Sequence, residues 1–280
     1  MQNMTPRRSS MRLTRRGRIA LIATGAVVTA AVVAVVVPLL QWETKPEKPK
    51  LLTIPEGWRA GQVYAAVDKA LSVPAGTTKN ILPKAGLKLP RDAAGNPEGY
   101  LFPATYPITK KTTPTSLLAY MVDTANKKFA PAPVAAGANK NISNLYQTVT
   151  IASIIQAEAG TKDDMGKVAR VIYNRLDKGM PLQMDSTINY ALGRSTLLTS
   201  DDDTRINSPY NSYTRMGLPP TPIANPGEDA MRAATTPTPG EWLYFVTVKS
   251  GDTRFTSSYD EQQRNVTEFN QNMKSAEPTG

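Results

Sequence analysis

An uncharged apolar run near the amino terminus constrains the fold of this 280-residue chain more than any other feature. The run covers Ile19–Leu40, and its 22 residues exceed the roughly 20 that a helix needs to cross a bilayer. Residues 1–18 before it contain six arginines and no acidic residue. Because such arginines stay in the cytoplasm, the pattern predicts a cell-membrane protein with a basic cytoplasmic tail (1–18), a single transmembrane helix (19–41) and an extracytoplasmic remainder. A cleaved signal peptide is the alternative, but the run is long for one and lacks a small-x-small cleavage motif near its end.

The same amino-terminal segment explains most of the charge of the chain. The formal charge is +10, and the six arginines leave about +4 for the remainder. Because the arginines adjoin the predicted span, we expect them to contact anionic membrane lipid. Binding to nucleic acid is not expected, since the cations needed for phosphate contacts lie beside the membrane.

The chain contains no cysteine and no histidine. Their absence excludes Ser-His-Asp and Cys-His catalytic sites, and zinc sites built on imidazole or thiolate. No metal and no cofactor are therefore predicted. Acid–base chemistry is left mainly to Asp, Glu, Lys and Tyr.

Beyond the predicted span, the sequence favours an α+β protein in two parts. Residues 42–50 alternate charge with proline, as a linker does. Residues 51–95 combine a short strand with two short helices and resemble a LysM-like module, for which packing and sugar binding are equally open interpretations. A larger mixed α+β domain is predicted over 96–272, followed by a disordered tail over 273–280.

One carboxylate of the larger domain lies in a pattern typical of a buried helix face. Ile151, Ile154, Ile155 and Glu158 are spaced at i, i+3, i+4 and i+7, so Glu158 is expected to point inward. It falls in the last turn of a helix predicted from Ser143 as N-cap to Gly160 as left-handed cap. The helix dipole and burial both favour its protonated form. A carboxyl with a raised pKa can donate a proton near neutral pH, which makes Glu158 a candidate general acid.

The spacing alone leaves other interpretations of Glu158 open. The carboxylate can pair with Arg170 or Arg175, since structural ion pairs also perturb carboxylates, or it can lie at a partly exposed helix end. A second amphipathic helix is predicted before Gly179, and Asp185 is expected to cap a short third helix, with Gln183 and Tyr190 nearby.

Several motifs in a fixed order identify a family. They are "EGYLFPATY", "ASIIQAEAG", "VARVIYNRL", "GMPLQMDSTINYALG", "SPYNSY" and "GLPPTPIANPG". Together they resemble the endolytic murein transglycosylases, the MltG or YceG-like family, over roughly residues 51–266. The sequence departs from many relatives at Gln156, where they have Glu, and in lacking histidines near its carboxyl-terminal strands.

The resemblance implies an activity and a site for the domain over 96–272. Members cut the β-1,4 bond between N-acetylmuramic acid and N-acetylglucosamine in nascent peptidoglycan without water, leaving a 1,6-anhydro end. The catalytic acid of the family corresponds to Glu158, acting as general acid and then as base. The implied partners are peptidoglycan strands and, by extension, peptidoglycan synthases and division proteins. The expected substrate-binding residues are Gln183, Asp185, Tyr190, Asn207, Tyr210, Asn211, Tyr213 and Asn225.

Two other functions remain compatible with the sequence. The first is a non-catalytic peptidoglycan-binding or cell-division scaffold. The second is a muramidase that uses water, with Asp185 or one of Asp201, Asp202 and Asp203 as the second carboxylate. An acidic run such as "SDDDTR" is more typical of a solvated turn.

Overall fold

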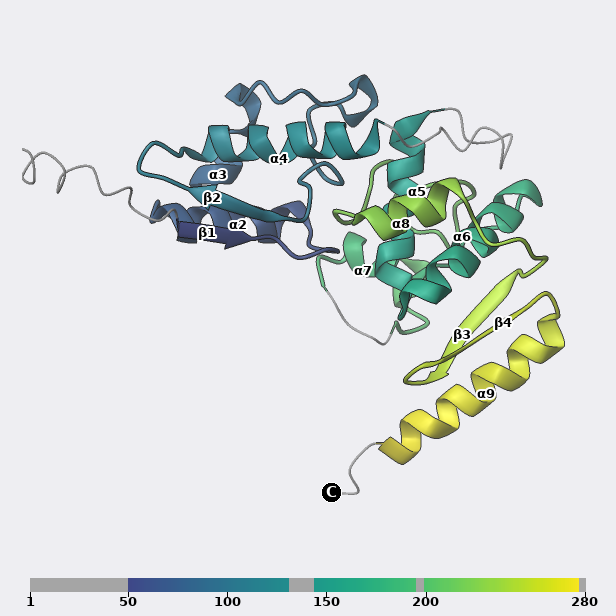
Figure 1. The fold of residues 1–280 in the computed structure, drawn as a ribbon. Coiled ribbons are helices and arrows are strands. Elements are labelled where there is room, and N and C mark those ends of the chain that lie inside the picture. Colours follow the sequence, from purple (N-terminus) through teal and green to yellow (C-terminus); the bar gives the residue numbers. More distant parts are fainter. Residues whose placement is uncertain (1–49, 131–143, 195–198, 277–280) are drawn as a thin grey trace, which may run out of the picture. The chain divides into compact units, whose positions relative to one another are not determined.

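The strand that begins the described chain pairs with a strand far along the sequence. The computed structural model describes residues 50–130, 144–194 and 199–276. β1 (Lys50–Thr53) is antiparallel to β2 (Thr105–Ile108), with Leu52 opposite Tyr106. Between the two strands lie the helices α2 (Ala60–Leu71) and α3 (Thr77–Asn80) and the 3-10 turns η1 (Leu82–Lys84) and η2 (Arg91–Ala93). The long helix α4 (Pro114–Phe129) follows β2 (Figure 1).

The predicted strand and two short helices of the segment 51–95 are confirmed by β1, α2 and α3. The β1–β2 pairing crosses the boundary expected at residue 95, and the described residues from Lys50 onward belong to one compact unit. That this segment is a separate module therefore stays a prediction. The start of α4 is as expected, because the Thr113 side chain accepts a hydrogen bond from the Ser116 amide and Pro114 occupies the first turn.

Helix α5 (Leu145–Glu158) is the core helix of the fold. It contacts α6 (Lys162–Asp177), α7 (Asp185–Ala191) and α8 (Glu228–Thr235). Every residue from Thr148 to Ile155 is buried, so α5 is enclosed on nearly all sides and has no broad solvent face.

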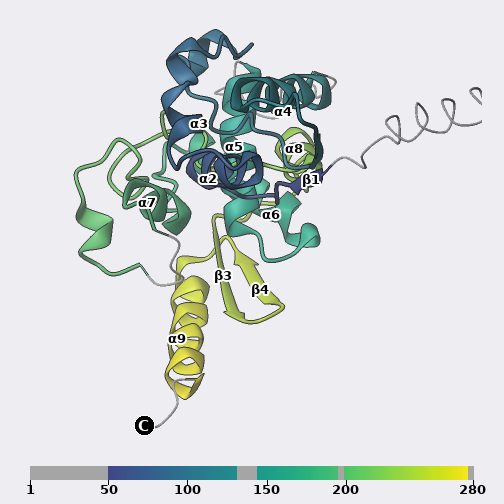
Figure 2. The same cartoon turned by 90° about the vertical axis from the view of Figure 1, so that its left-hand side faces the viewer.

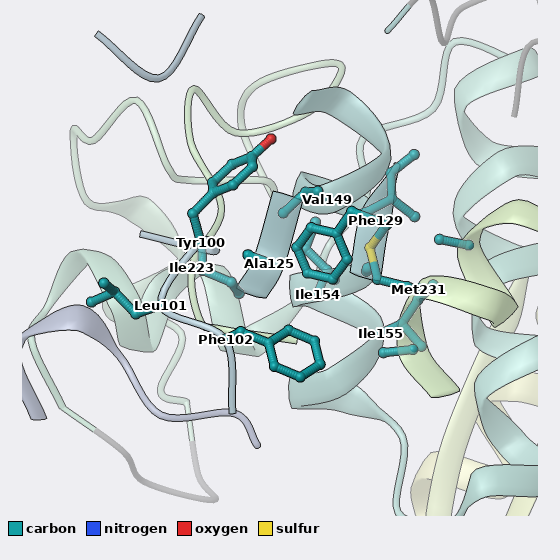
Figure 3. Packing of buried hydrophobic residues seen from close by; sticks show 14 of the residues in the cluster. Tyr100, Leu101, Phe102, Ala125, Phe129, Val149, Ile154, Ile155, Ile223 and Met231 are labelled. Atoms are coloured by element: carbon teal, nitrogen blue, oxygen red, sulfur yellow. The ribbon is translucent and has the colours of Figure 1, made fainter. Parts of the chain in front are cut away.

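Residues far apart in the sequence pack together against α5. Figure 3 shows Phe129 of α4 among Val149 and Ile154 of α5, with Met231 of α8 beside them. The sequence predicts an extended connector over 96–108 whose aromatic residues pack on a neighbour, and two of them do so on Phe129. The ring centroids of Tyr100 and Phe102 lie 6.1 and 5.8 Å from the Phe129 centroid. The third, Tyr106, is also buried.

The ends of α5 differ from the prediction. Its N-cap is Asn144, whose side chain accepts from the Gln147 amide, and not Ser143, which lies outside the described residues. At the other end Ala159 is the cap in an extended conformation, so the predicted left-handed cap at Gly160 is wrong. The following helix α6 ends as predicted before Gly179, which has a φ of +62°.

The carboxyl-terminal part is a hairpin with a helix. β3 (Tyr244–Lys249) pairs antiparallel with β4 (Asp252–Thr256), and α9 (Tyr259–Ala276) packs along β3 (Figure 2). The sequence predicts a buried strand over Trp242–Val248 with Phe255 on its partner strand, and the partner is confirmed because Phe255 is opposite Phe245. The prediction of a buried strand is wrong: only Val248 of β3 is buried, because β3 belongs to a two-stranded hairpin that α9 covers only in part.

No helix within residues 50–130, 144–194 and 199–276 is long and apolar enough to cross a membrane. The predicted cytoplasmic tail (1–18), the predicted span (19–41) and all but the last residue of the linker (42–50) lie outside the described residues.

Candidate active site

Glu158 is the last residue of α5 and is half-buried. The backbone N–H of Ser186, in the first turn of α7, donates to Glu158 Oε1 at 3.0 Å. Burial raises the pKa of Glu158, the negative charge of Asp185 raises it further, and the donors of Ser186 oppose the shift. The arrangement favours the protonated form of the carboxyl, which is the form that a general acid needs.

The alternative ion pairs of Glu158 are not formed in the described part of the chain. Arg170 donates through Nε to the Thr238 carbonyl at 2.9 Å. The buried guanidinium of Arg175 donates instead to the carbonyls of Pro181, Leu182 and Leu243 at 2.6–3.0 Å. The interpretation of Glu158 as the partner of either arginine is therefore wrong.

Asp185 and Tyr213 form a pair beside Glu158. The Tyr213 hydroxyl donates to Asp185 Oδ1 at 2.5 Å. Burial raises the pKa of Tyr213, and the hydrogen bond to Asp185 and the charges of Asp185 and Glu158 add to the shift. Asp185 is the first residue of α7 and not its cap, because the cap position belongs to Met184. Its carboxylate is directed to Tyr213 and does not cap the helix, contrary to the prediction.

Gln183 shapes the loop that leads into α7. Its φ of +52° is in the left-handed region, which is unusual for a residue with a side chain. Two hydrogen bonds hold this conformation. The backbone N–H of Gln183 donates to the Ser212 carbonyl at 2.9 Å, and the side-chain Oε1 accepts from Arg175 Nη1 at 2.9 Å. Gln183, Asp185 and Tyr213 thus lie together around the amino-terminal end of α7, near Glu158.

The other predicted binding residues lie farther along α7 or in loops. The rings of Tyr190 and Tyr210 are 4.9 Å apart between centroids. Asn207 is exposed, and its Oδ1 accepts from Arg215. Asn211 and Asn225 are fully buried, with both amide groups already hydrogen-bonded to protein. Binding of a glycan by any of the eight residues remains a prediction.

A cavity of about 480 Å³ lies on the loop between α7 and α8. Its lining consists of residues 209–212 and 215–220, which include Tyr210 and Asn211 but not Glu158. One wall is attached to the start of α7, because the Ser212 hydroxyl accepts from the Met184 amide at 2.9 Å. A residue of the cavity wall is therefore hydrogen-bonded to the start of α7, the helix whose Ser186 amide contacts Glu158.

Comparison with known proteins decides the family. The model of the YceG-like family matches residues 27–268. The chain belongs to the YceG-like family. This confirms the resemblance that the ordered motifs indicate.

Relatives of this YceG-like chain include enzymes of known name. It is 39% identical over 168 residues to the endolytic murein transglycosylase of Bacillus subtilis (strain 168), covering 60% of the chain and 46% of that protein. It is 34% identical over 253 residues to the endolytic murein transglycosylase of Streptococcus pneumoniae serotype 2 (strain D39), covering 80% of the chain and 46% of that protein. The chain thus spans about half the length of the curated relatives it matches.

A solved structure supports the fold of this YceG-like chain. The crystal structure of a yceG-like protein from Listeria monocytogenes is similar with a TM-score of 0.67 at 29% identity, covering 77% of this chain and 75% of that one. The predicted mixed α+β architecture is confirmed by this likeness.

Sequence reasoning missed Glu98. This carboxyl is 4% exposed, and burial raises its pKa to about 7. Ala60, Tyr190 and Asn225 each donate a hydrogen bond to it. The only sequence signal for Glu98 was its place as the single acid of the aromatic motif "EGYLFPATY". Nothing in the local pattern distinguishes this glutamate from a surface residue.

Proposed function

We propose that this chain is a lytic transglycosylase that cleaves the β-1,4 bond between N-acetylmuramic acid and N-acetylglucosamine in nascent peptidoglycan. The observation that carries the proposal is the place of Glu158, whose carboxyl accepts the Ser186 amide at the end of α5 and whose pKa is raised by burial. Two relatives named endolytic murein transglycosylase support the substrate class.

In the proposed reaction Glu158 donates its proton to the glycosidic oxygen as the bond from that oxygen to C1 of the muramic residue breaks. Positive charge develops at C1. The 6-hydroxyl of the same muramic residue attacks C1 and forms the 1,6-anhydro ring, and its proton passes to the Glu158 carboxylate. Glu158 ends protonated, no water is consumed, and one carboxyl performs both proton transfers.

The contacts around Glu158 fit this cycle. The Ser186 amide donates to the carboxyl at 3.0 Å and stabilises the carboxylate that exists between the two proton transfers. Because burial outweighs this donor, the pKa of Glu158 is raised, which favours the protonated acid before bond cleavage and the return of a proton to the carboxylate afterwards.

The water-using alternative receives less support from the other carboxylates. A muramidase needs a second carboxylate free to activate water or attack C1. Asp185 accepts the Tyr213 hydroxyl, and Asp203 accepts from Arg194 and from Ser200. The carboxylate of Asp202 is solvated, at 97% side-chain exposure.

The site of action follows from the amino-terminal segment. We propose that residues 19–41 anchor the chain in the cell membrane and that residues 1–18 contact anionic lipid on the cytoplasmic side. The catalytic part then faces the peptidoglycan. Peptidoglycan synthases and division proteins are the proposed partners there.

Digestion of purified glycan strands tests the activity. The full chain in detergent and its Glu158→Gln variant are incubated with strands, and products are analysed by mass spectrometry. We expect anhydro ends, lighter than hydrolysis products by one water, from the parent chain and a loss of about 10²–10⁴-fold in the variant. Exposed Glu241 supplies the matched control, Glu241→Gln, which should remain active.

Each other outcome points to a different function. Hydrolysed ends would indicate a muramidase. Binding of strands without cleavage by the parent chain would indicate a glycan-binding scaffold. Undiminished anhydro products from the Glu158→Gln variant would remove Glu158 from the mechanism.

A further inference from the structure

Glu98 joins three separate elements through one buried carboxyl. Its Oε1 accepts from the Ala60 amide at 2.9 Å, in the first turn of α2, and from Asn225 Nδ2 at 3.3 Å, in the loop before α8. Its Oε2 accepts from the Tyr190 hydroxyl of α7 at 3.2 Å. A buried carboxyl with donors from three elements fixes their relative positions, because each unpaired group would be costly.

The carboxyl-terminal end of α7 is held at this junction. Besides donating to Glu98, Tyr190 packs beneath the Arg59 guanidinium, whose carbon lies 5.2 Å from the ring centroid. Arg59 also donates to the carbonyls of Asn189 and Arg194 at 3.2 and 2.8 Å. Arg59, the residue before α2, and the Glu98 carboxyl thus both contact the carboxyl-terminal end of α7.

The opposite end of α7 contacts the proposed catalytic acid. Ser186 donates its amide to Glu158, and Ser186 and Tyr190 are four residues apart on the same helix. At 1.5 Å per residue the two contacts are separated by about 6 Å along the axis, roughly one helical turn. Such a short helix moves as one body, so a displacement at Tyr190 reaches the Ser186 amide.

We propose that Glu98 is a positioning residue for Glu158: through the Tyr190 hydroxyl it fixes α7 so that the Ser186 amide reaches the Glu158 carboxyl. This inference rests on the proposed role of Glu158 as catalytic acid. Glu98 itself takes no part in proton transfer to the sugar.

The ionisation of Glu98 makes this link sensitive to pH. The ionisable groups that face its carboxyl are Arg59, Tyr64 and Tyr190. The charged carboxylate accepts all three hydrogen bonds, and Arg59 favours that form. Protonation at Oε2 turns that oxygen into a donor, and the Tyr190 hydroxyl must then accept rather than donate to keep its contact.

A double-mutant cycle in the full chain tests the proposal. Glu98→Gln, Tyr190→Phe and the double variant are assayed on purified glycan strands for kcat, KM and their pH dependence, and melting is followed separately. We expect each single variant to lose about tenfold to a hundredfold in kcat with little change in KM, because the acid is misplaced. The double variant should lose no more than the worse single variant, because both changes break the same link.

The pH profile distinguishes positioning from mere support of the fold. Losing the Ser186 amide removes a donor that favours charged Glu158, so the alkaline limb of kcat should move to higher pH in Glu98→Gln and Tyr190→Phe. A purely structural role would lower the melting temperature and leave that limb in place, which would overturn the proposal. Losses that multiply in the double variant would overturn it as well.

Two controls separate the possible failures. The exposed Glu241→Gln change should leave kcat unchanged. If Glu158→Gln is inactive while folded Glu98→Gln is normal, only the positioning role is refuted; if Glu158→Gln is fully active, the proposed function itself is refuted. If Glu98→Gln does not fold, Tyr190→Phe decides the proposal alone, since it keeps the ring between Arg59 and Tyr210.

Discussion

The amide of Ser186 donates to the carboxyl of Glu158 at 3.0 Å, so the end of α5 meets the first turn of α7. The preceding residue, Asp185, brings a negative charge to the same place. The two neighbours act in opposite directions on the pKa of Glu158, and burial exceeds both. This balance gives a measurable pH dependence.

The first prediction concerns the alkaline limb of activity. Because protonated Glu158 is the proposed acid, the rate should fall as pH rises through its raised pKa. Asp185→Asn removes a charge that raises this pKa while keeping an oxygen for Tyr213, so the limb should move to lower pH. The shift should be small, because Asp185 contributes less than burial. Rates of anhydro product formation between pH 4 and 9 measure the position of the limb. The exposed Asp177→Asn change is the control and should not move the limb. A shift to higher pH in Asp185→Asn would contradict the prediction.

The second prediction concerns the Tyr213–Asp185 hydrogen bond. Tyr213→Phe removes the donor at 2.5 Å from a partly buried carboxylate and should cost about 1.5–3 kcal/mol of unfolding free energy, the range for hydrogen bonds to charged groups. Urea unfolding followed by circular dichroism measures it. Tyr120→Phe is the matched control, because Tyr120 is 50% exposed and keeps its ring contact with Tyr106. Equal midpoints for the two variants would show that the bond contributes nothing.

The third prediction concerns Arg175, which is 6% exposed and donates to three carbonyls and to Gln183 Oε1. Lysine cannot reproduce this planar set of donors, so Arg175→Lys should cost about 2–4 kcal/mol. For a domain of this size each kcal/mol lowers Tm by roughly 2–4 °C. Calorimetry checks it against Arg232→Lys, whose side chain is 70% exposed. A Tm equal to that control would refute the role given to the guanidinium.

The fourth prediction concerns the pH dependence of stability. Burial raises the pKa of Glu98 to about 7, above roughly 4.3 for an unfolded glutamate, so the native state binds this proton more tightly. The resulting stabilisation is fully present below about pH 4 and is lost as pH rises through about 7, by roughly 4 kcal/mol in total. Glu98→Gln cannot titrate and should lose less stability between pH 5 and 8 than the parent chain. Urea unfolding at both pH values tests this, with Glu241→Gln as control; parallel losses in the parent chain and in the Glu98→Gln variant would contradict it.

Helices were predicted well because their signals are local. The spacing of Val63 and Val67 and the Thr113–Pro114 cap identified α2 and α4. β2 was missed because Pro107 argues against a strand, yet Pro107 lies opposite Leu51 in a two-stranded sheet, where each strand has a free edge. Its pairing with β1 depends on contacts that no local pattern contains.

The candidate site likewise has features that local sequence patterns predict and contacts that they do not. Glu158 was predicted from its position on a helical stripe, and the structure keeps Ile151, Ile154 and Ile155 of that stripe fully buried. The contact with Ser186 and the junction at Glu98 were not predictable, because they join segments remote in the sequence. Asn225 illustrates the difference: the family resemblance implies a substrate-binding amide, whereas its buried side chain bonds to Trp58 and Leu101.

The bond from Arg175 Nε to the Leu243 carbonyl, 2.6 Å long, has a practical consequence for shortened or chimeric proteins. A chain cut just before Leu243 would retain the buried guanidinium and lose this carbonyl acceptor, together with the Tyr244 ring that stacks on the guanidinium. A truncation or a fusion junction is therefore best placed after this hairpin, so that the Leu243 carbonyl and the Tyr244 ring remain with Arg175.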